Sequence, residues 1–307
     1  MTQKRITIII CTYNRANILS DCLQSLVEQT CDPSLFEVLI VDNNSTDETP
    51  QIARQYTEQY THFQLVKEEL QGLSHARNQG YQEANTPWVS YVDDDAKAYP
   101  NYAERAIWTI QNFDFDCFGG TYYAWHKYGK PSWLPDNYGT KSLIQEEVGI
   151  MEKGFASGGV IVFKKSVLEA LGGFPTHLGM TGNKISYGEE IYLQTQMRSQ
   201  GYILGFDPEL KIDHLVAKYK LKLWWHVKSS FRKGETSWET FEHSVKNKKL
   251  TYIGKKALYT LRDNIKSHTP RLTKTSYSWQ HWVMDVINPL AKELGRLWGA
   301  YRLKQRY

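Results

Sequence analysis

Three segments of the chain share one pattern: a short run of β-branched and aliphatic residues, then a polar loop, then apolar residues at helical spacing. The three runs cover residues 5–11, 36–41 and 88–92, and each stops at polar residues. Runs of this kind are typical of strands that are buried on both faces of a parallel sheet. Ligands of such sheets lie across the carboxyl ends of the strands. The sequence therefore predicts an α/β fold with a single, mostly parallel central sheet flanked by helices, and a site at the strand ends.

Three adjacent carboxylates come directly after the third run. Asp93, Asp94 and Asp95 repel one another, so they have little structural reason to share a sheet edge unless a cation or hydrogen-bond donors neutralise them. A solvated acidic turn is the alternative, because Asp is a common turn residue. Their place at the rim of the predicted sheet favours a binding site.

The net charge of +4 conceals opposite charges in two parts of the chain. Residues 211–307 contain 21 Lys or Arg and 7 Asp or Glu, a balance of +14, whereas residues 1–210 contain 16 and 26, a balance of −10. A nucleic-acid enzyme needs a positive active face, so the acidic part argues against nucleic acid as a partner. The four cysteines lack metal-type spacing, and a strand that starts by residue 5 leaves no room for a signal peptide. We therefore expect a cytoplasmic protein.

Seven segments stand out in order along the chain, namely residues 6–15, 38–47, 72–80, 93–95, 171–174, 188–190 and 212–214. No single segment is specific, but their order along residues 5 to about 235 is. Together they resemble the inverting family 2 glycosyltransferases of the GT-A fold. The resemblance implies a nucleotide-sugar donor, for which a UDP-sugar is the expectation, and transfer of a hexosyl or N-acetylhexosaminyl group to a glycan or polyisoprenyl-linked acceptor.

Seven residues are implied to hold the nucleotide-sugar donor, and five of them lie outside the acidic cluster. At the end of the second strand, Asp42 would accept the imide N–H of uracil, and Tyr13 would stack on the base. Thr12 and Arg15 belong to the same loop after the first strand. Arg77 would contact the base or the diphosphate; as a surface helix residue it would instead pair with Glu83 or with nothing.

The acidic cluster is implied to hold Mn²⁺ or Mg²⁺, which offsets the charge of the leaving diphosphate. By the resemblance Asp95 is the metal ligand, and Asp94 accepts hydrogen bonds from the ribose hydroxyls. Asp93 would orient the loop or contact the donor, although three consecutive acids leave the register of the family's DxD motif open by one residue. His214 would complete the metal shell, or be a hydrogen-bonded structural histidine.

An inverting transfer needs one base, which deprotonates the attacking hydroxyl of the acceptor. Glu190 is the expected base, because the second acid of an acidic doublet has this role in the family, and the doublet here opens a predicted helix. Glu189 is the second candidate. The alternative for both Glu190 and Glu189 is that they are ordinary acidic residues at a helix N-terminus, with no part in catalysis.

We expect residues 1–215 to form the GT-A catalytic domain, with a nucleotide-sugar half at about 1–98 and an acceptor half at about 99–215. Residues 216–307 are expected to form a helical, basic C-terminal region. This region contains Trp279, Trp282 and Trp298, and the combination of basic and aromatic residues favours the surface of an anionic bilayer. Peripheral attachment at the inner face of the cell membrane is therefore one expectation. Packing on the catalytic domain and a homodimer contact are the alternatives.

Three other functions fit the sequence less well. A sugar nucleotidyltransferase needs a Gly-rich phosphate loop after the first strand, and residues 11–15 contain no Gly. A processive polysaccharide synthase needs membrane spans and a Gln-x-x-Arg-Trp segment, and residues 194–200 lack the Trp. A weakly catalytic, glycosyltransferase-like scaffold in a polysaccharide biosynthesis complex is the remaining alternative, which the retained acids oppose.

Overall fold

The computed structural model describes residues 4–140, 145–182, 187–241 and 250–306. The chain divides into two compact units, and the second takes in two loops from the first 215 residues as well as the C-terminal region. The first unit comprises Met1–Trp125, Gly139–His177 and Glu189–Leu215, and the second His126–Tyr138, Leu178–Gly188 and Val216–Tyr307.

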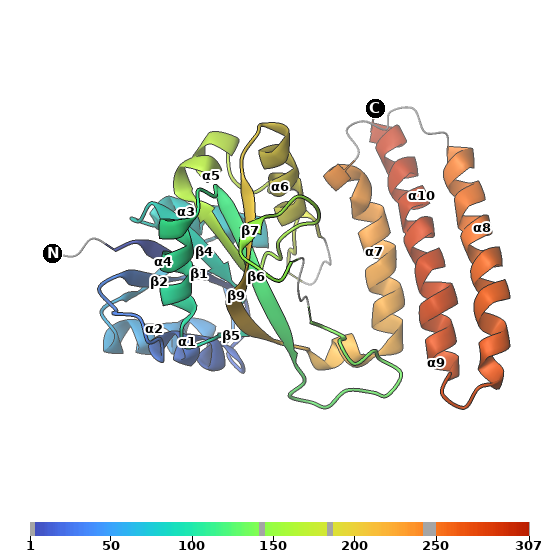
Figure 1. The fold of residues 1–307 in the computed structure, drawn as a ribbon, viewed down its shortest axis with the longest axis horizontal. Coiled ribbons are helices and arrows are strands. Elements are labelled where there is room, and N and C mark those ends of the chain that lie inside the picture. Colours follow the sequence, from blue (N-terminus) through green and yellow to red (C-terminus); the bar gives the residue numbers. More distant parts are fainter. Residues whose placement is uncertain (1–3, 141–144, 183–186, 242–249, 307) are drawn as a thin grey trace. The chain divides into compact units, whose positions relative to one another are not determined.

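A nine-stranded sheet forms the centre of the first unit (Figure 1). Strands β3, β2, β1 and β4 are parallel neighbours, β8 runs antiparallel between β4 and β6, and β9 pairs with β6, β5 and β7. The three strands predicted from the sequence correspond to β1, β2 and β4. The strands are β1 (Ile6–Thr12), β2 (Phe36–Asp42), β3 (Phe63–Lys67), β4 (Trp88–Val92), β5 (Ala96–Ala98), β6 (Cys117–Trp125), β7 (Gly149–Ile150), β8 (Val160–Lys164) and β9 (Leu204–Leu215).

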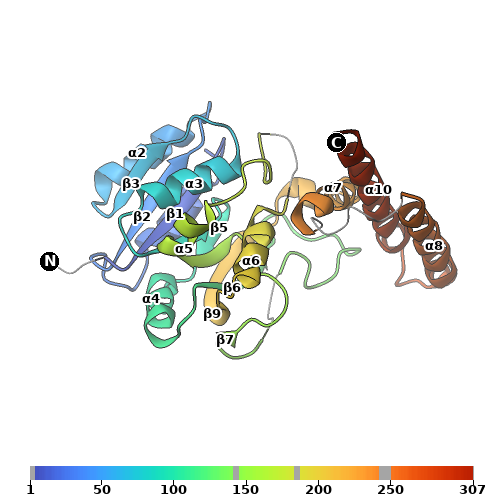
Figure 2. The same cartoon turned by 90° about the horizontal axis from the view of Figure 1, so that it is seen from above.

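Both faces of the sheet are covered by helices (Figure 2). Ile8 and Ile10 of β1 pack into one hydrophobic cluster with side chains of α1, α2 and α4, while Ile9 packs into another with side chains of α3, α5 and α6. This alternation explains why the run is apolar throughout, because successive side chains of a strand point to opposite faces. The prediction of an α/β sheet between helices is therefore confirmed. The helices are α1 (Leu19–Val27), α2 (Thr49–Gln59), α3 (Leu73–Glu83), α4 (Tyr102–Asn112), α5 (Lys165–Leu171) and α6 (Glu189–Ser199).

The ends of these strands bring distant residues to one edge. Thr12 and Asp42 are register partners at the ends of β1 and β2. Asp93, Asp94 and Asp95 form the turn between β4 and β5, and His214 pairs with Ala96 of β5. The sheet thus brings side chains of β1, β2, β9 and the turn after β4 to the edge where the sequence predicts the site.

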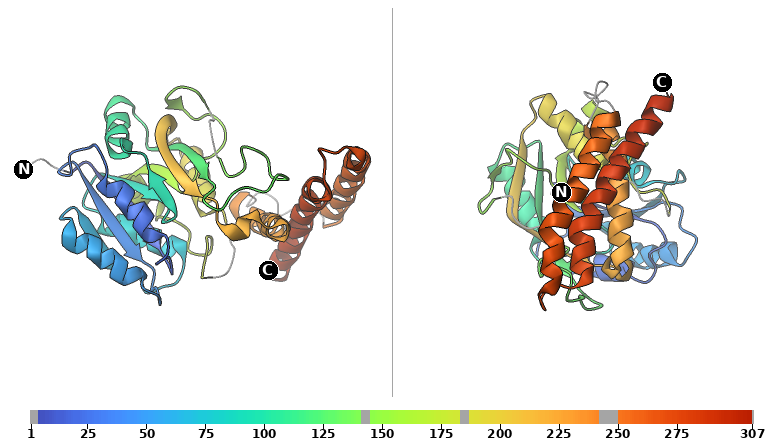
Figure 3. Two further views of the ribbon diagram at one scale, coloured as in Figure 1. Left: turned by 90° about the horizontal axis from the view of Figure 1, so that it is seen from below. Right: turned by 90° about the vertical axis from the view of Figure 1, so that its right-hand side faces the viewer.

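The second unit is helical, and three of its helices lie side by side with α10 packed against both α7 and α8 (Figure 3). A Cβ atom on Gly234 of α7 would lie 2.0 Å from the Lys292 carbonyl oxygen, and one on Gly295 of α10 would lie 1.9 Å from that of Phe231. These glycines therefore allow backbone contact between α7 and α10. In the described parts of the chain, no helix combines the length and apolar character of a membrane span. The elements are η1 (Lys218–Leu221), α7 (Leu223–Phe241), α8 (Leu250–His268), η2 (Thr269–Thr273), α9 (Trp279–Trp282), the π-helical η3 (Val283–Ile287) and α10 (Asn288–Arg306).

Candidate active site

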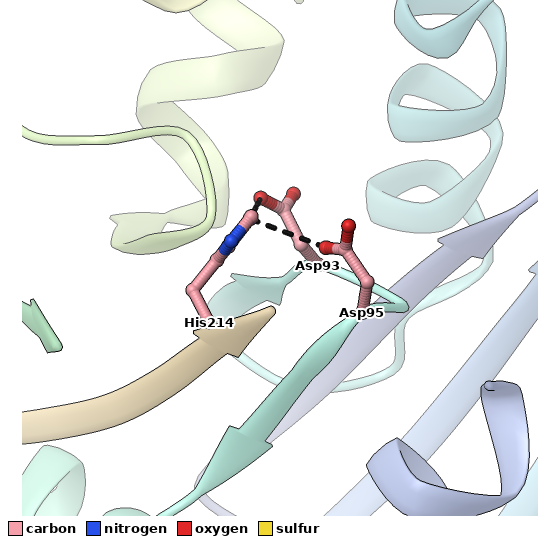
Figure 4. Close-up of side chains that lie close together, drawn as sticks. All are labelled: Asp93, Asp95 and His214. Atoms are coloured by element: carbon pink, nitrogen blue, oxygen red, sulfur yellow. Dashed lines mark hydrogen bonds and ion pairs between the residues drawn. The ribbon is translucent and has the colours of Figure 1, made fainter. Parts of the chain in front are cut away.

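Asp93, Asp95 and His214 point toward one another at the sheet edge (Figure 4). One ligand atom from each lies within 4.8 Å of the others. His214 Nε2 is 3.1 Å from Asp93 Oδ2 and 3.2 Å from Asp95 Oδ1. Asp95 and His214 are the two metal ligands expected from the sequence, and Asp93 lies beside them in the structure. The acids of this group are thus spaced as Asp-x-Asp.

The surroundings of His214 suit a metal ligand. Its Nδ1 is 3.1 Å from the Leu215 carbonyl oxygen, which can only accept a hydrogen bond, so Nδ1 carries the proton that bonds there. In the neutral ring Nε2 then presents its lone pair toward the two carboxylates. Tyr122 stacks on the ring at a centroid distance of 5.0 Å and restricts its rotation. Two carboxylates and one imidazole nitrogen fit a hard or borderline divalent cation such as Mn²⁺ or Mg²⁺.

Asp94, between the two clustered acids, has a different environment. Its side chain is buried, and Arg15 Nε lies 3.5 Å from Asp94 Oδ1. Burial raises the pKa of Asp94 to about 7, and Asp95 adds to the effect while Arg15 opposes it. Near neutral pH this carboxyl can therefore both donate and accept hydrogen bonds. Hydroxyl groups of a sugar or ribose are suitable partners for it.

The first two strands contribute a second group of polar residues. Asp42 is buried, and its Oδ1 accepts a hydrogen bond of 3.2 Å from the Ser45 N–H. Thr12 is buried beside it in register, and Tyr13 and Arg15 come next in the chain, both half-buried. The structure thus places Thr12, Tyr13, Arg15 and Asp42 along one pair of strand ends, and Arg15 connects this pair to Asp94.

Two asparagines, which the sequence did not identify as site residues, hold these loops together. Asn43 is buried; its side-chain amide donates to the carbonyls of Glu68 and Leu70, and its Oδ1 accepts from the Gly72 N–H. Asn14, at a φ of 52°, accepts a bond of 2.8 Å from the Thr46 N–H. Asn is one of the few residues that tolerate a positive φ and hydrogen-bond neighbouring backbone, so its place directly after a strand was the available signal.

Glu189 and Glu190 open α6 in different environments. Glu189 is buried and accepts a hydrogen bond of 2.8 Å from Arg77 Nη1, whereas Glu190 is half-buried. Burial raises the pKa of Glu189 to about 7; Glu190 adds to the effect and Arg77 opposes it. Arg77 is itself buried, which rules out the alternative of a surface residue. Glu83, the partner considered in that alternative, accepts instead from Gln79.

A glycine pair before β8 was also missed. A Cβ atom on Gly158 would lie 2.7 Å from Arg77 Nη2, and one on Gly159 would lie 2.2 Å from Asp93 Oδ2. Only glycine leaves room for these two side chains. Adjacent glycines directly before a β-branched run were the signal in the sequence.

Solved structures identify the fold. Mannosyltransferase PcManGT from Pyrobaculum calidifontis, in complex with GDP-Man and Mn²⁺, superposes with a TM-score of 0.65 at 20% identity, covering 97% of this chain and 88% of that one. TarS from S. aureus, in complex with UDP-GlcNAc, superposes with a TM-score of 0.59 at 15% identity, covering 98% and 92%. The fold is that of GT-A glycosyltransferases, as predicted.

Sequence comparison gives the family. Residues 7–172, more than half of the chain, match the family model for glycosyl transferase family 2, and the chain belongs to this family. Glycosyltransferase AglE of Haloferax volcanii is 30% identical over 202 residues, which are 66% of this chain and 64% of AglE. Glucosyl-dolichyl phosphate glucuronosyltransferase of the same organism is 25% identical over 243 residues, which are 75% of each chain. The match thus spans somewhat less than two thirds of AglE.

Proposed function

We propose that this protein transfers a hexosyl or N-acetylhexosaminyl group from a nucleotide diphosphate sugar to a glycan or lipid-linked acceptor, with inversion at the anomeric carbon. The observation that carries the proposal is the convergence of Asp93, Asp95 and His214 at the sheet edge. A cation at that place offsets the diphosphate charge while the donor binds across the strand ends. Family membership makes glycosyl transfer the reaction to test first.

The strand-end residues support a UDP-sugar as donor. The Asp42 carboxylate suits the imide N–H of uracil, Tyr13 supplies an aromatic ring for stacking on the base, and Asp94 suits the ribose hydroxyls. Thr12 and Arg15 line the same strand end, and Arg15 adds a cation beside Asp94. The solved neighbours include one complex with UDP-GlcNAc and one with GDP-Man, so both nucleotides belong in the test.

The two acids of α6 support a division of roles. Glu190 is half-buried and can reach a ligand, so we assign it the proton of the acceptor hydroxyl. That hydroxyl attacks the anomeric carbon on the face opposite the diphosphate, forming the new C–O bond as the bond to the diphosphate oxygen breaks. Mn²⁺ or Mg²⁺, held by Asp93, Asp95 and His214, would stabilise the negative charge on the departing nucleotide. A single displacement inverts the anomeric configuration.

A lipid-linked acceptor is supported by the second unit. The related glucuronosyltransferase acts, by its name, on glucosyl-dolichyl phosphate. Here the basic helical unit exposes large apolar side chains, among them Trp224, Trp279 and Trp298. Basic and aromatic residues together favour an anionic bilayer surface, so the proposal includes peripheral attachment to the cytoplasmic face of the membrane. A homodimer through the same unit is the competing assignment for these side chains.

Donor turnover tests the proposed reaction. The full chain is incubated with Mn²⁺ and each of UDP-glucose, UDP-galactose, UDP-N-acetylglucosamine, UDP-glucuronic acid and GDP-mannose, and release of the nucleoside diphosphate is measured with and without simple glycoside acceptors. We expect metal-dependent release with one donor, and NMR of the glycosylated product should show inversion. A product with retained configuration contradicts the single displacement. Absence of release with every donor, with and without acceptor, contradicts the proposed activity.

A further inference from the structure

The Arg77 guanidinium, which the proposed function leaves without a role, lies where several of the motif segments meet. Arg77 projects from α3, and its side chain is only 5% exposed. Nη1 donates to Glu189 Oε1 over 2.8 Å, and Nη2 donates to the Gly158 carbonyl over 3.2 Å. Nη2 also lies 3.9 Å from Asp93 Oδ1. One buried cation therefore connects the acidic doublet of α6 with the metal-type cluster at the end of β4.

Aromatic rings hold this guanidinium in place. Its central carbon lies 5.8 Å from the ring centroid of Tyr91 and 5.3 Å from that of Phe174. The Tyr91 hydroxyl donates to the Arg77 carbonyl over 2.9 Å. Asn78 then fixes Phe174, because its amide donates to the Phe174 carbonyl and its Oδ1 accepts from the Phe174 N–H. The segments 72–80 and 171–174, which the sequence singled out, thus meet around Arg77.

The electrostatics tie the guanidinium to its present partners. The side chains of Arg77 and Glu189 are 5% and 7% exposed, so their ion pair of 2.8 Å is almost fully shielded from water. To reach a ligand, Arg77 would have to leave Glu189, and a buried carboxylate that loses its partner is strongly destabilising. A direct contact between Arg77 and the donor, which the sequence suggested, is therefore disfavoured.

We infer that Arg77 is a positioning residue, which fixes Glu189 and the first turn of α6 relative to Asp93, and thereby sets Glu190 at its working distance from the donor. The inference rests on the proposed function, since it assumes that Glu190 acts on an acceptor bound near the metal-type cluster. Lys cannot replace Arg here, because an ammonium lacks the planar fork that contacts Glu189 and Gly158 together. A displaced α6 would misplace the base without removing any nucleotide contact.

The test is a double-mutant cycle on the full chain with Arg77→Lys, Glu189→Gln and the double variant. Release of nucleoside diphosphate gives kcat and KM for the donor, calorimetry with UDP and Mn²⁺ gives Kd, and circular dichroism reports folding. Each single variant should lower kcat by about 10–100-fold, as loss of a supporting contact does, with Kd changed less than about threefold. The double variant should fall no further than the lower single variant, because both substitutions weaken the same charge-assisted contact.

Arg105→Lys is the matched control. Arg105 forms a comparable fork on Asp207, with bonds of 2.7 and 2.9 Å, on α4 of the same unit. This substitution should lower the melting temperature while leaving kcat unchanged, which separates a loss of stability from a loss of positioning.

Three results would overturn the inference. A rise in KM and Kd at unchanged kcat in Arg77→Lys would show that Arg77 contacts the donor directly. Additive losses in the double variant would show that Arg77 and Glu189 act separately. Unchanged kcat in Glu189→Gln would also overturn it, and this variant carries the test alone if Arg77→Lys does not fold. Absence of turnover by the wild-type protein contradicts the proposed function itself, whereas losses confined to the variants of an active protein bear on Arg77.

Discussion

The difference between Glu189 and Glu190 is a difference of environment, not of chemistry. Glu189 is 5% exposed and holds Arg77, so it has a structural partner already. Glu190 is half-buried at the start of the same helix. A base must be ionised and must reach the acceptor hydroxyl. Of the two acids, Glu190 is the more accessible, and we therefore propose it as the base.

Glu190→Gln should lower kcat by on the order of 10²–10⁴, which corresponds to about 2.7–5.4 kcal/mol of transition-state stabilisation. The Kd for UDP with Mn²⁺ should stay nearly unchanged, because Gln keeps the size of the side chain and the nucleotide contacts lie elsewhere. Donor turnover and calorimetry measure the two quantities. Glu189→Gln should have a milder effect. If Glu189→Gln had the larger effect, the base would be Glu189, and loss of UDP binding in Glu190→Gln would mean that this residue has a structural role.

At the scale of elements, the strands and the polar loops at their ends were predictable, while the side-chain partners were not. The β-branched run at residues 5–11 is typical of a buried strand, and the observed strand, Ile6–Thr12, places Thr12 at its end. The partner of Arg77 is 112 residues away, and that of His214 is 121 residues away. Such pairs depend on how β8, β9 and α6 return to the sheet, which local periodicity does not encode. The sequence therefore predicts that Arg77 lies near the site, but the partner considered for it, Glu83, is wrong, since Arg77 pairs with Glu189.

The crossing of α7 and α10 gives a prediction for packing. Gly234→Ala places a methyl group against the Lys292 carbonyl, where only 2.0 Å is available, so the helices must separate. Overpacking of this kind costs about 1–3 kcal/mol, which urea denaturation monitored by circular dichroism can measure. Gly254→Ala on α8 is the control, since nothing lies within 4 Å of its Cβ; it should stabilise by about 0.5–1 kcal/mol through helix propensity. Equal effects of the two substitutions would contradict the close contact between α7 and α10.

At the scale of the whole molecule, the two parts of the chain carry net charges of opposite sign, −10 over residues 1–210 and +14 over residues 211–307. The basic part also exposes aromatic side chains. Trp224 is 69% exposed, Trp279 58% and Trp298 46%. Trp282, the third tryptophan noted in the sequence, is half-buried and donates to the Thr269 hydroxyl. Trp224 and Trp279 are therefore the side chains best placed to enter a bilayer surface.

The full chain should sediment with anionic liposomes at low salt and be released at high salt, because each basic residue near the surface contributes about 1 kcal/mol that salt screens. Trp224→Ser combined with Trp279→Ser should weaken sedimentation several-fold. Trp108→Ser is the control, since Trp108 is 40% exposed on α4 of the other unit. Failure of the wild-type chain to sediment would assign these side chains to protein packing or a dimer, which analytical ultracentrifugation would then detect.

We propose that the cluster of Asp93, Asp95 and His214 holds the metal through which a nucleotide binds. The most direct measurement is the melting temperature of the full chain with UDP, in Mn²⁺ or in EDTA, for the wild type and for Asp95→Asn, with Asp21→Asn on α1 as a control carboxylate outside the cluster. UDP at a hundredfold excess over its Kd should stabilise the wild type and Asp21→Asn by about 2.7 kcal/mol in Mn²⁺, a shift of several degrees. The shift should vanish in EDTA and in Asp95→Asn. A larger shift with GDP would overturn the assignment of Asp42 to uracil and leave the metal site intact, whereas equal stabilisation by UDP in EDTA, or by UDP and Mn²⁺ in Asp95→Asn, would contradict the metal site itself.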